Sequence, residues 1–128
     1  MIKATNLLFG YSEEREKALN GVNFSAEKGE FIAVLGSNGC GKSTLAKLIN
    51  GLYQPTKGTV VVSGMDTRDE DKIIAIRSKA GMVFQNPDNQ MVATIVEEDV
   101  AFGPENLGVP QKELRKRVDS ALQAVNMF

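Results

Sequence analysis

The clearest chemistry in this chain lies in nine consecutive residues, Gly36-Ser37-Asn38-Gly39-Cys40-Gly41-Lys42-Ser43-Thr44. They match the phosphate-binding template G-x-x-x-x-G-K-S/T in full. In such a loop, backbone N–H groups and the positive end of the next helix face an anion together. Lys42 would reach the β- and γ-phosphates of a nucleoside triphosphate, and the hydroxyl of Ser43 would bind Mg²⁺. The alternative is a glycine-rich turn capped by a serine.

This loop requires a strand before it and a helix after it, and the flanking sequence predicts both. Residues 31–35 are a continuous apolar run, which is typical of a strand covered on both faces. Residues 44–49 have a helical pattern. The remaining patterns in this part predict strands at 2–10, 21–26, 59–62 and 81–84, a charged hairpin connection at 12–17, and a short helix at 69–80 with Ile73, Ile74 and Ile76 as candidate core contacts.

The last third of the sequence predicts a loop and two helices. Thr94 is expected to cap a helix over residues 95–105, with Glu97 completing a capping box. Pro110 stands where an N1 proline would open a second helix. That helix carries an apolar stripe expected to face a core or a subdomain contact, made of Leu114, Val118, Leu122 and Val125. Together the elements predict an α/β P-loop fold, with a mixed sheet whose N-terminal strands are antiparallel.

Composition excludes several classes of protein. The chain has 128 residues and a formal net charge of −1, so it has no basic footprint for a nucleic acid partner. It has one cysteine and no histidine, which excludes an internal disulfide, a structural zinc site and a histidine-based triad within this chain. Its apolar runs are far too short to span a membrane. We therefore expect a soluble domain of the reducing cytoplasm that can still dock onto a membrane protein.

Three features together narrow the kind of phosphate loop. Tyr11 ends the first strand upstream of the loop, Gln85 follows a predicted strand downstream of it, and the Asp-x-x-Gly and Asn-Lys-x-Asp elements of GTPases are missing. This arrangement resembles the nucleotide-binding domain of ATP-binding cassette (ABC) transporters. The resemblance implies that Tyr11 stacks on adenine, that residues 36–44 are the Walker A loop, and that Gln85 begins the Q-loop and binds Mg²⁺ or a water. The alternatives are an ordinary strand-end tyrosine and a generic polar loop residue.

The segment 85–106 resembles a narrower group, the ATPases of energy-coupling factor (ECF) importers for vitamins and for transition metals such as cobalt and nickel. The resemblance implies an ATP-binding core at about 1–92 and the start of a helical subdomain at about 93–128. It implies a second ATPase subunit, an integral membrane transport subunit and a substrate-binding membrane component as partners, at the cytoplasmic face of the membrane. An acidic rim would contact arginines of the membrane subunit, unless it is only a solvated helix face; its residues are Glu97, Glu98, Asp99 and Glu105.

The resemblance covers only the N-terminal half of the family's domain. A Leu-Ser-Gly-Gly-Gln signature, a Walker B aspartate with its catalytic glutamate, and a switch histidine are all missing from the sequence. Lys42 and Gln85 would serve catalysis in an intact ATPase, whereas this truncated chain is expected to bind ATP and Mg²⁺ with hydrolysis near background. Two other functions stay open: a nucleotide-binding module without catalysis, and a soluble cassette ATPase that acts on DNA or ribosomes.

Cys40 departs from the small residue usual within such a loop. We expect alkylation of its thiol to block ATP binding, and bound ATP to protect it. The alternative is an inert small residue that only fills the loop.

Overall fold

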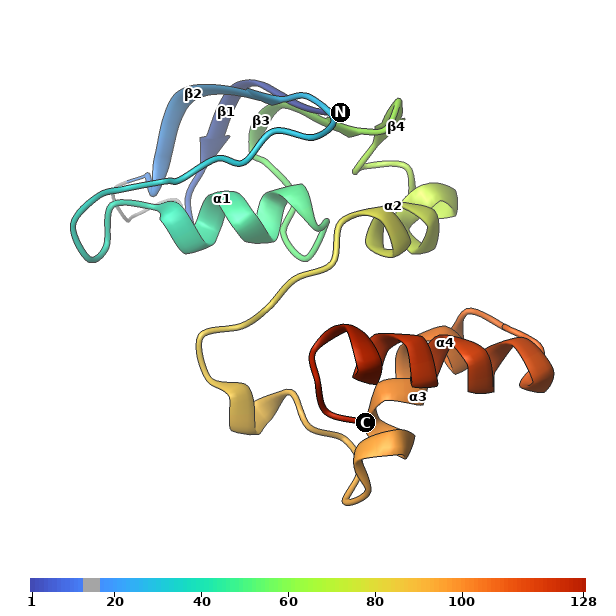
Figure 1. Ribbon diagram of the computed structural model, residues 1–128. Coiled ribbons are helices and arrows are strands. Elements are labelled where there is room, and N and C mark those ends of the chain that lie inside the picture. Colours follow the sequence, from blue (N-terminus) through green and yellow to red (C-terminus); the bar gives the residue numbers. More distant parts are fainter. Residues whose placement is uncertain (13–16) are drawn as a thin grey trace. The chain divides into compact units, whose positions relative to one another are not determined.

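Two units make up the computed structural model of this chain, Met1–Met82 and Val83–Phe128 (Figure 1). The structure describes residues 1–12 and 17–128. Most of the predicted charged connection at 12–17 therefore lies outside the described residues. The residues of each unit contact mainly other residues of the same unit.

The first unit contains a four-stranded sheet in the order β2-β1-β3-β4. Its strands are β1 (Ile2–Phe9), β2 (Leu19–Ala26), β3 (Lys57–Val62) and β4 (Met65–Asp66). Every pairing in it is antiparallel. The strands predicted at 2–10, 21–26 and 59–62 are thus confirmed. β4 was missed because it is two residues long; Ser63 and Gly64, both with positive φ, make the tight turn that creates it.

Helix α1 (Lys42–Ile49) confirms the helix predicted after the phosphate-binding loop, and it lies along one face of the sheet (Figure 1). Its buried Leu45 and Leu48 belong to a core that also takes residues from β1, β2, β3 and the next helix: Ala4, Leu7, Phe9, Leu19, Val60, Val62 and Ile76. Burial of each such side chain is worth roughly 1.5–3 kcal/mol. This core fixes the helix against the strands that carry the candidate site.

The helix predicted over 69–80 is a 3₁₀ turn, η1 (Glu70–Lys72), followed by α2 (Ile73–Lys79). The carboxylate of Asp69 caps the turn by accepting from the N–H of Asp71. Ile76 is fully buried, whereas Ile74 is 68% exposed, so the prediction of Ile74 as a core contact is wrong. A helix of two turns has room for only a narrow buried face, and Ile74 lies two positions from its centre.

Gly58 lets β1 and β3 come close together. Its φ is +89°, and a Cβ atom there would collide with the carbonyl oxygens of Thr5 and Asn6. The pairing of β1 with β3 shifts register between Thr5 and Leu8, and Asn6 itself has a φ of 48°. Only glycine fits this backbone approach without displacing a strand.

Two predicted strands are wrong. Residues 31–35 and 81–84 are both extended without forming a strand, and Phe31 is 97% exposed and Val83 87% exposed. The apolar composition of a central strand is present in both, but a strand also requires a neighbouring backbone. No segment of the described residues pairs with either one. The sheet in this structure is therefore antiparallel rather than mixed.

The second unit holds a 3₁₀ turn, η2 (Pro87–Asn89), and two helices, α3 (Val96–Asn106) and α4 (Gln111–Ala124), which pack on each other. Val118 and Leu122 of α4 are buried, Leu114 is half-buried, and Val125 is exposed because α4 ends before it. Pro110 is the N-cap of α4 and not its first residue, so the helix begins one residue later than predicted. Among the described residues, no helix is long and apolar enough to cross a lipid bilayer.

The predicted capping box of α3 is wrong. The N-cap is Ile95, whose side chain cannot accept a hydrogen bond, and Glu97 bonds elsewhere. Asp99 serves this helix end instead, because its Oδ1 accepts from the N–H of Val92 at 2.7 Å and of Ala93 at 3.1 Å. The carboxylate thus orders the chain that leads into the helix, and it also suits the helix dipole.

Candidate functional site

The phosphate-binding loop runs from the extended segment at 31–35 into α1, and a glycine sets the start of the helix. Gly41 is the N-cap, with a φ of +104°. A Cβ atom there would lie 2.8 Å from the carbonyl oxygen of Ala18 and 2.9 Å from Cδ2 of Leu19. The glycine therefore lets the first turn of α1 lie directly against the start of β2, where a larger residue would push it away.

Lys42 closes the loop on itself. Its Nζ donates to the carbonyl oxygen of Gly36 at 2.7 Å and of Ser37 at 2.9 Å, and it lies 3.3 Å from Sγ of Cys40. The ammonium group is thereby held over the loop, while the residues around it are exposed. A single positive charge, ringed by backbone at a helix N-terminus, is an arrangement suited to an anion.

The two hydroxyl residues of the loop have different surroundings. Ser43 is exposed in the first turn of α1, so its oxygen is accessible to a cation. Thr44 is 4% exposed, and its Oγ1 lies 2.7 Å from the hydroxyl of Tyr11. A hydrogen bond therefore joins the candidate base-stacking residue to the phosphate-binding loop.

Tyr11 is supported by two other aromatic side chains. Phe9 and Tyr53 stack with their ring centroids 5.2 Å apart and 8° between their planes. The edge of Tyr11 meets both rings at steep angles, 85° to Phe9 and 89° to Tyr53. Tyr11 itself remains 56% exposed. Such a held, half-exposed ring can offer a flat surface to a base.

Tyr53 was not found from the sequence. It follows α1 in a turn without a pattern of its own, and only the packing of the turn against β1 brings it to Phe9. The ammonium of Lys47 lies 5.2 Å from the centre of its ring, a distance at which a cation–π contact is favourable.

Gln85 lies in the second unit, in the loop between residues 83 and 90, and its side chain is exposed. Its neighbours order that loop: Oδ1 of Asn86 accepts from the N–H of Asp88 at 3.1 Å, and Pro87 begins η2. Its amide oxygen is a neutral ligand of the type that Mg²⁺ accepts. Gln85 and the phosphate-binding loop belong to different units.

Comparison with known proteins decides the family. A family model described as ABC transporter matches residues 19–128. The chain belongs to the ABC transporter family.

This ABC chain spans about half the length of the relatives that it matches. It is 60% identical to the energy-coupling factor transporter ATP-binding protein EcfA1 of Clostridium novyi, over 100% of the chain and 47% of that protein. It is similar to the structure of cbiO1 from Clostridium perfringens, part of the ABC transporter complex cbiONQ, with 39% identity and a TM-score of 0.81 over 95% of the chain and 49% of cbiO1. The dimeric ATP-binding cassette MJ0796 bound to ADP and Pi is 31% identical, with a TM-score of 0.80 over 96% of the chain and 56% of its own.

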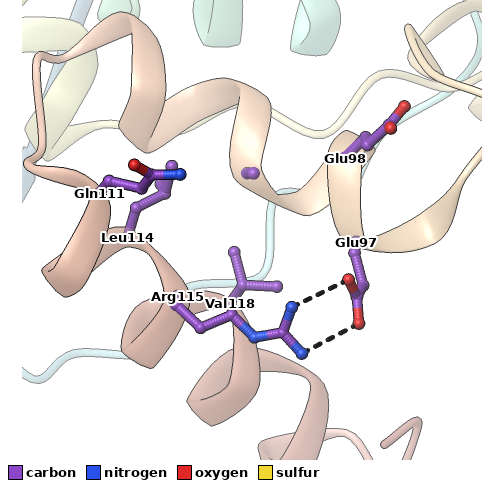
Figure 2. A pocket seen from close by; sticks show the side chains of 7 residues that line it. Glu97, Glu98, Gln111, Leu114, Arg115 and Val118 are labelled. Carbon is purple, nitrogen blue, oxygen red and sulfur yellow. Dashed lines mark hydrogen bonds and ion pairs between the residues drawn. The ribbon is translucent and has the colours of Figure 1, made fainter.

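The acidic residues of the ABC chain's second unit are not equivalent. Glu97 accepts a two-point hydrogen bond from Arg115, at 3.1 and 3.2 Å, which ties α3 to α4 (Figure 2). Arg115 also lies 3.1 Å from Asp119, and the charges of Asp119 and Glu97 raise the pKa of the guanidinium. Asp99 is occupied with the backbone before α3. Two of the four residues predicted to contact a partner thus have bonds within the chain.

The other two residues of that acidic set, Glu98 and Glu105, are exposed and have no ion pair among the described residues. Glu98 lies at the edge of a groove of about 220 Å³ between α3 and α4, whose other lining residues are Glu97, Ala101, Gln111, Leu114, Arg115 and Val118 (Figure 2). The floor of the groove is apolar and its rim is charged. Such a surface can accept a side chain of another protein.

Proposed function

We propose that this chain is the nucleotide-binding part of an ATPase subunit that energises an ECF-type importer of vitamins or transition metal ions. The observation that carries the proposal is the hydrogen bond between Tyr11 and Thr44 beside the Lys42-closed loop. This bond joins the ring of Tyr11 to the basic loop within one unit, which supports a base site beside a phosphate site. The proposal also draws support from the ECF and cbiO relatives.

The phosphates of ATP would occupy the loop formed by residues 36–44. Their oxygens would replace the carbonyl oxygens of Gly36 and Ser37 as partners of the Lys42 ammonium. A phosphate oxygen adds a negative charge to the pair, which a backbone carbonyl oxygen lacks. The backbone N–H groups of the loop, with those at the start of α1, would provide the remaining donors.

Mg²⁺ fits the donors that are present. The exposed hydroxyl of Ser43 and the amide oxygen of Gln85 are neutral oxygen ligands, and the phosphates of ATP would supply the negative charge. Bound Mg²⁺ would neutralise charge that develops on the phosphates during hydrolysis. The chain's own part is to hold the phosphates with Lys42 and to orient a water or the metal with Gln85.

The relatives also support proposals about the subunits with which this chain assembles. The dimeric cassette MJ0796 supports a second ATPase subunit as a partner, and the complex of cbiO1 supports a membrane transport subunit. We propose a peripheral position at the cytoplasmic face of the membrane, with the substrate-binding component as a separate membrane protein. Exposed Glu98 and Glu105 would contribute to the contact with basic residues of the membrane subunit.

The test is a binding titration on the complete gene product that contains this chain. Lys42→Ala is expected to weaken Mg²⁺–ATP binding by roughly 10- to 100-fold, since a hydrogen bond to a charged group is worth about 1.5–3 kcal/mol. Lys79→Ala, an exposed lysine at the end of α2, is the matched control. Equal affinity in the two variants would contradict nucleotide binding by this loop. Failure to co-purify with an integral membrane protein would contradict the importer assignment alone.

A further inference from the structure

The side chain of Gln90 binds the backbone of Phe84 at two points. The N–H of Phe84 donates to Oε1 of Gln90 at 3.1 Å, and Nε2 of Gln90 donates to the carbonyl oxygen of Phe84 at 3.1 Å. The same Nε2 lies 3.4 Å from the carbonyl oxygen of Asn86. One amide group therefore holds the chain on both sides of Gln85.

A primary amide is well suited to this pair of bonds. It offers a donor and an acceptor side by side, whereas a carboxylate has no donor and an ammonium has no acceptor. The two-point contact reproduces what a neighbouring strand would give to Phe84. Among the described residues, no strand pairs with residues 81–84, so Gln90 satisfies the backbone that a sheet partner would satisfy.

The rest of the loop is fixed from its other side. Oδ1 of Asn86 accepts from the N–H of Asp88, and the N–H of Gln90 donates to the carbonyl oxygen of Pro87 at 3.1 Å. Gln90 is half-buried while Gln85 is exposed. Gln85 is thus an exposed side chain carried on a backbone that the amide of Gln90 closes.

We infer that Gln90 is a positioning residue for Gln85: its side-chain amide fixes the backbone that aims Gln85 at the metal or the attacking water. The inference rests on the proposed function. The side chain of Gln90 is occupied by the backbone of Phe84 and Asn86, so its contribution to the reaction would pass through Gln85. A loss of loop order should appear in turnover more than in ATP affinity, because the phosphate-binding loop is untouched.

The experiment measures steady-state ATP hydrolysis by the complete gene product in its assembled complex. Gln90→Glu keeps the shape and removes the donor, and Gln90→Leu removes both bonds. Gln123→Glu, an exposed position on α4, is the matched control for the added charge. Each Gln90 variant is also combined with Gln85→Ala to form a double-mutant cycle. Melting temperature and the hydrogen exchange of the Phe84 amide are recorded for every variant.

We expect Gln90→Glu and Gln90→Leu to lower kcat by roughly 10-fold or more, with KM for Mg²⁺–ATP within about twofold of wild type. In the Gln85→Ala background the same changes should have almost no further effect on kcat. The Phe84 amide should exchange faster in Gln90→Leu, which confirms that the bonds exist in solution. Gln123→Glu should behave as wild type.

Four results would overturn the inference. One is an undiminished kcat in both Gln90 variants while Gln85→Ala is impaired; another is an equal loss of kcat with and without Gln85, which signals a structural role only. Both leave the proposed function standing. If Gln85→Ala keeps full activity, or if the wild-type protein binds no ATP, then the role proposed for the loop fails and the inference fails with it.

Discussion

The hydroxyl of Tyr11, two residues after β1, lies 2.7 Å from Oγ1 of Thr44 in the first turn of α1, 33 positions along the chain. Thr44 is buried, so water competes little for this bond. The geometry of the aromatic surface and the geometry of the phosphate-binding loop are therefore linked before any nucleotide arrives. Prior ordering of this kind reduces the entropy that binding must overcome.

Tyr11→Phe removes the bond and keeps the ring. We expect ATP affinity to fall about fivefold, since a neutral hydrogen bond contributes about 1 kcal/mol. Tyr53→Phe is the matched control, because it retains the stack on Phe9 and its hydroxyl has no hydrogen bond among the described residues. Titration with a fluorescent ATP analogue measures both. Equal affinities of the two variants would show that the hydrogen bond between Tyr11 and Thr44 has no part in ATP binding.

Cys40 provides a chemical probe of the same loop. Its thiol is exposed and lies 3.3 Å from Nζ of Lys42, so a maleimide adduct would occupy the space over the loop. We expect N-ethylmaleimide to abolish ATP binding and saturating ATP to slow modification by roughly 10-fold or more, as for a site blocked at 10 times its Kd. Mass spectrometry of the peptide that contains Cys40 measures the rate. The variant Cys40→Ser should bind ATP and resist the reagent; unprotected modification in the wild-type protein would place the thiol outside the nucleotide site.

The sequence was most informative where function depends on adjacent residues. The loop at 36–44 stood out because its glycines, Lys42 and Ser43 lie within nine positions, and α1 and β1 could be predicted from their periodicity. Tyr53 and Gln90 could not, because each acts through a backbone or ring that only the folded chain brings near. The ion pair of Glu97 with Arg115 joins residues 18 positions apart and has no signature in either helix.

The errors have a common physical origin. Residues 31–35 and 81–84 were predicted as strands from their apolar side chains alone, but the hydrogen-bonding partner of a strand is not encoded in its own letters. The capping box at Thr94 failed because the helix starts one residue later, at the N-cap Ile95, and because the carboxylate of Glu97 binds Arg115 instead of the backbone. Both errors concern the hydrogen-bonding partner of a segment, and tertiary contacts decide which partner that is.

Glu98 is the better probe of the proposed partner surface, because Glu97 and Asp99 already have structural bonds. Glu98→Lys is expected to reduce co-purification with the membrane subunit by about fivefold or more, through repulsion between like charges, and to leave ATP affinity unchanged. Glu27→Lys, an exposed charge reversal in the first unit, is the control. Undiminished assembly would remove Glu98 from the interface, and a parallel loss in Glu27→Lys would reveal a non-specific charge effect.

Stability at low pH should depend on Asp66 at the start of the turn after β4. Hydrogen bonds from the side chain and the backbone N–H of Arg68 lower the pKa of this carboxyl below its usual value of 3.8. The unfolded chain therefore takes up the proton first as the pH falls. The stabilisation is complete above the unfolded pKa and disappears as the pH falls through the folded one.

We expect the urea midpoint of the wild-type protein to fall more steeply below about pH 4 than that of Asp66→Asn. The side chains are partly exposed, so the difference should be at most about 1 kcal/mol. Asp71→Asn, at an exposed carboxyl without an ion pair among the described residues, is the control and should follow the wild type. Identical curves for Asp66→Asn and the wild type would mean that the pair with Arg68 does not form in solution.

Gly58 lies within the contact of β1 with β3, where any Cβ atom would meet the carbonyl oxygens of Thr5 and Asn6. Relief of that collision would have to move β1, and β1 leads directly to Phe9 and Tyr11. A single methyl group at position 58 would thus misalign the base-stacking ring with a phosphate-binding loop whose every residue is intact. Inherited variation at this position would therefore appear in the laboratory as a loss of nucleotide affinity, caused by a residue that no nucleotide touches.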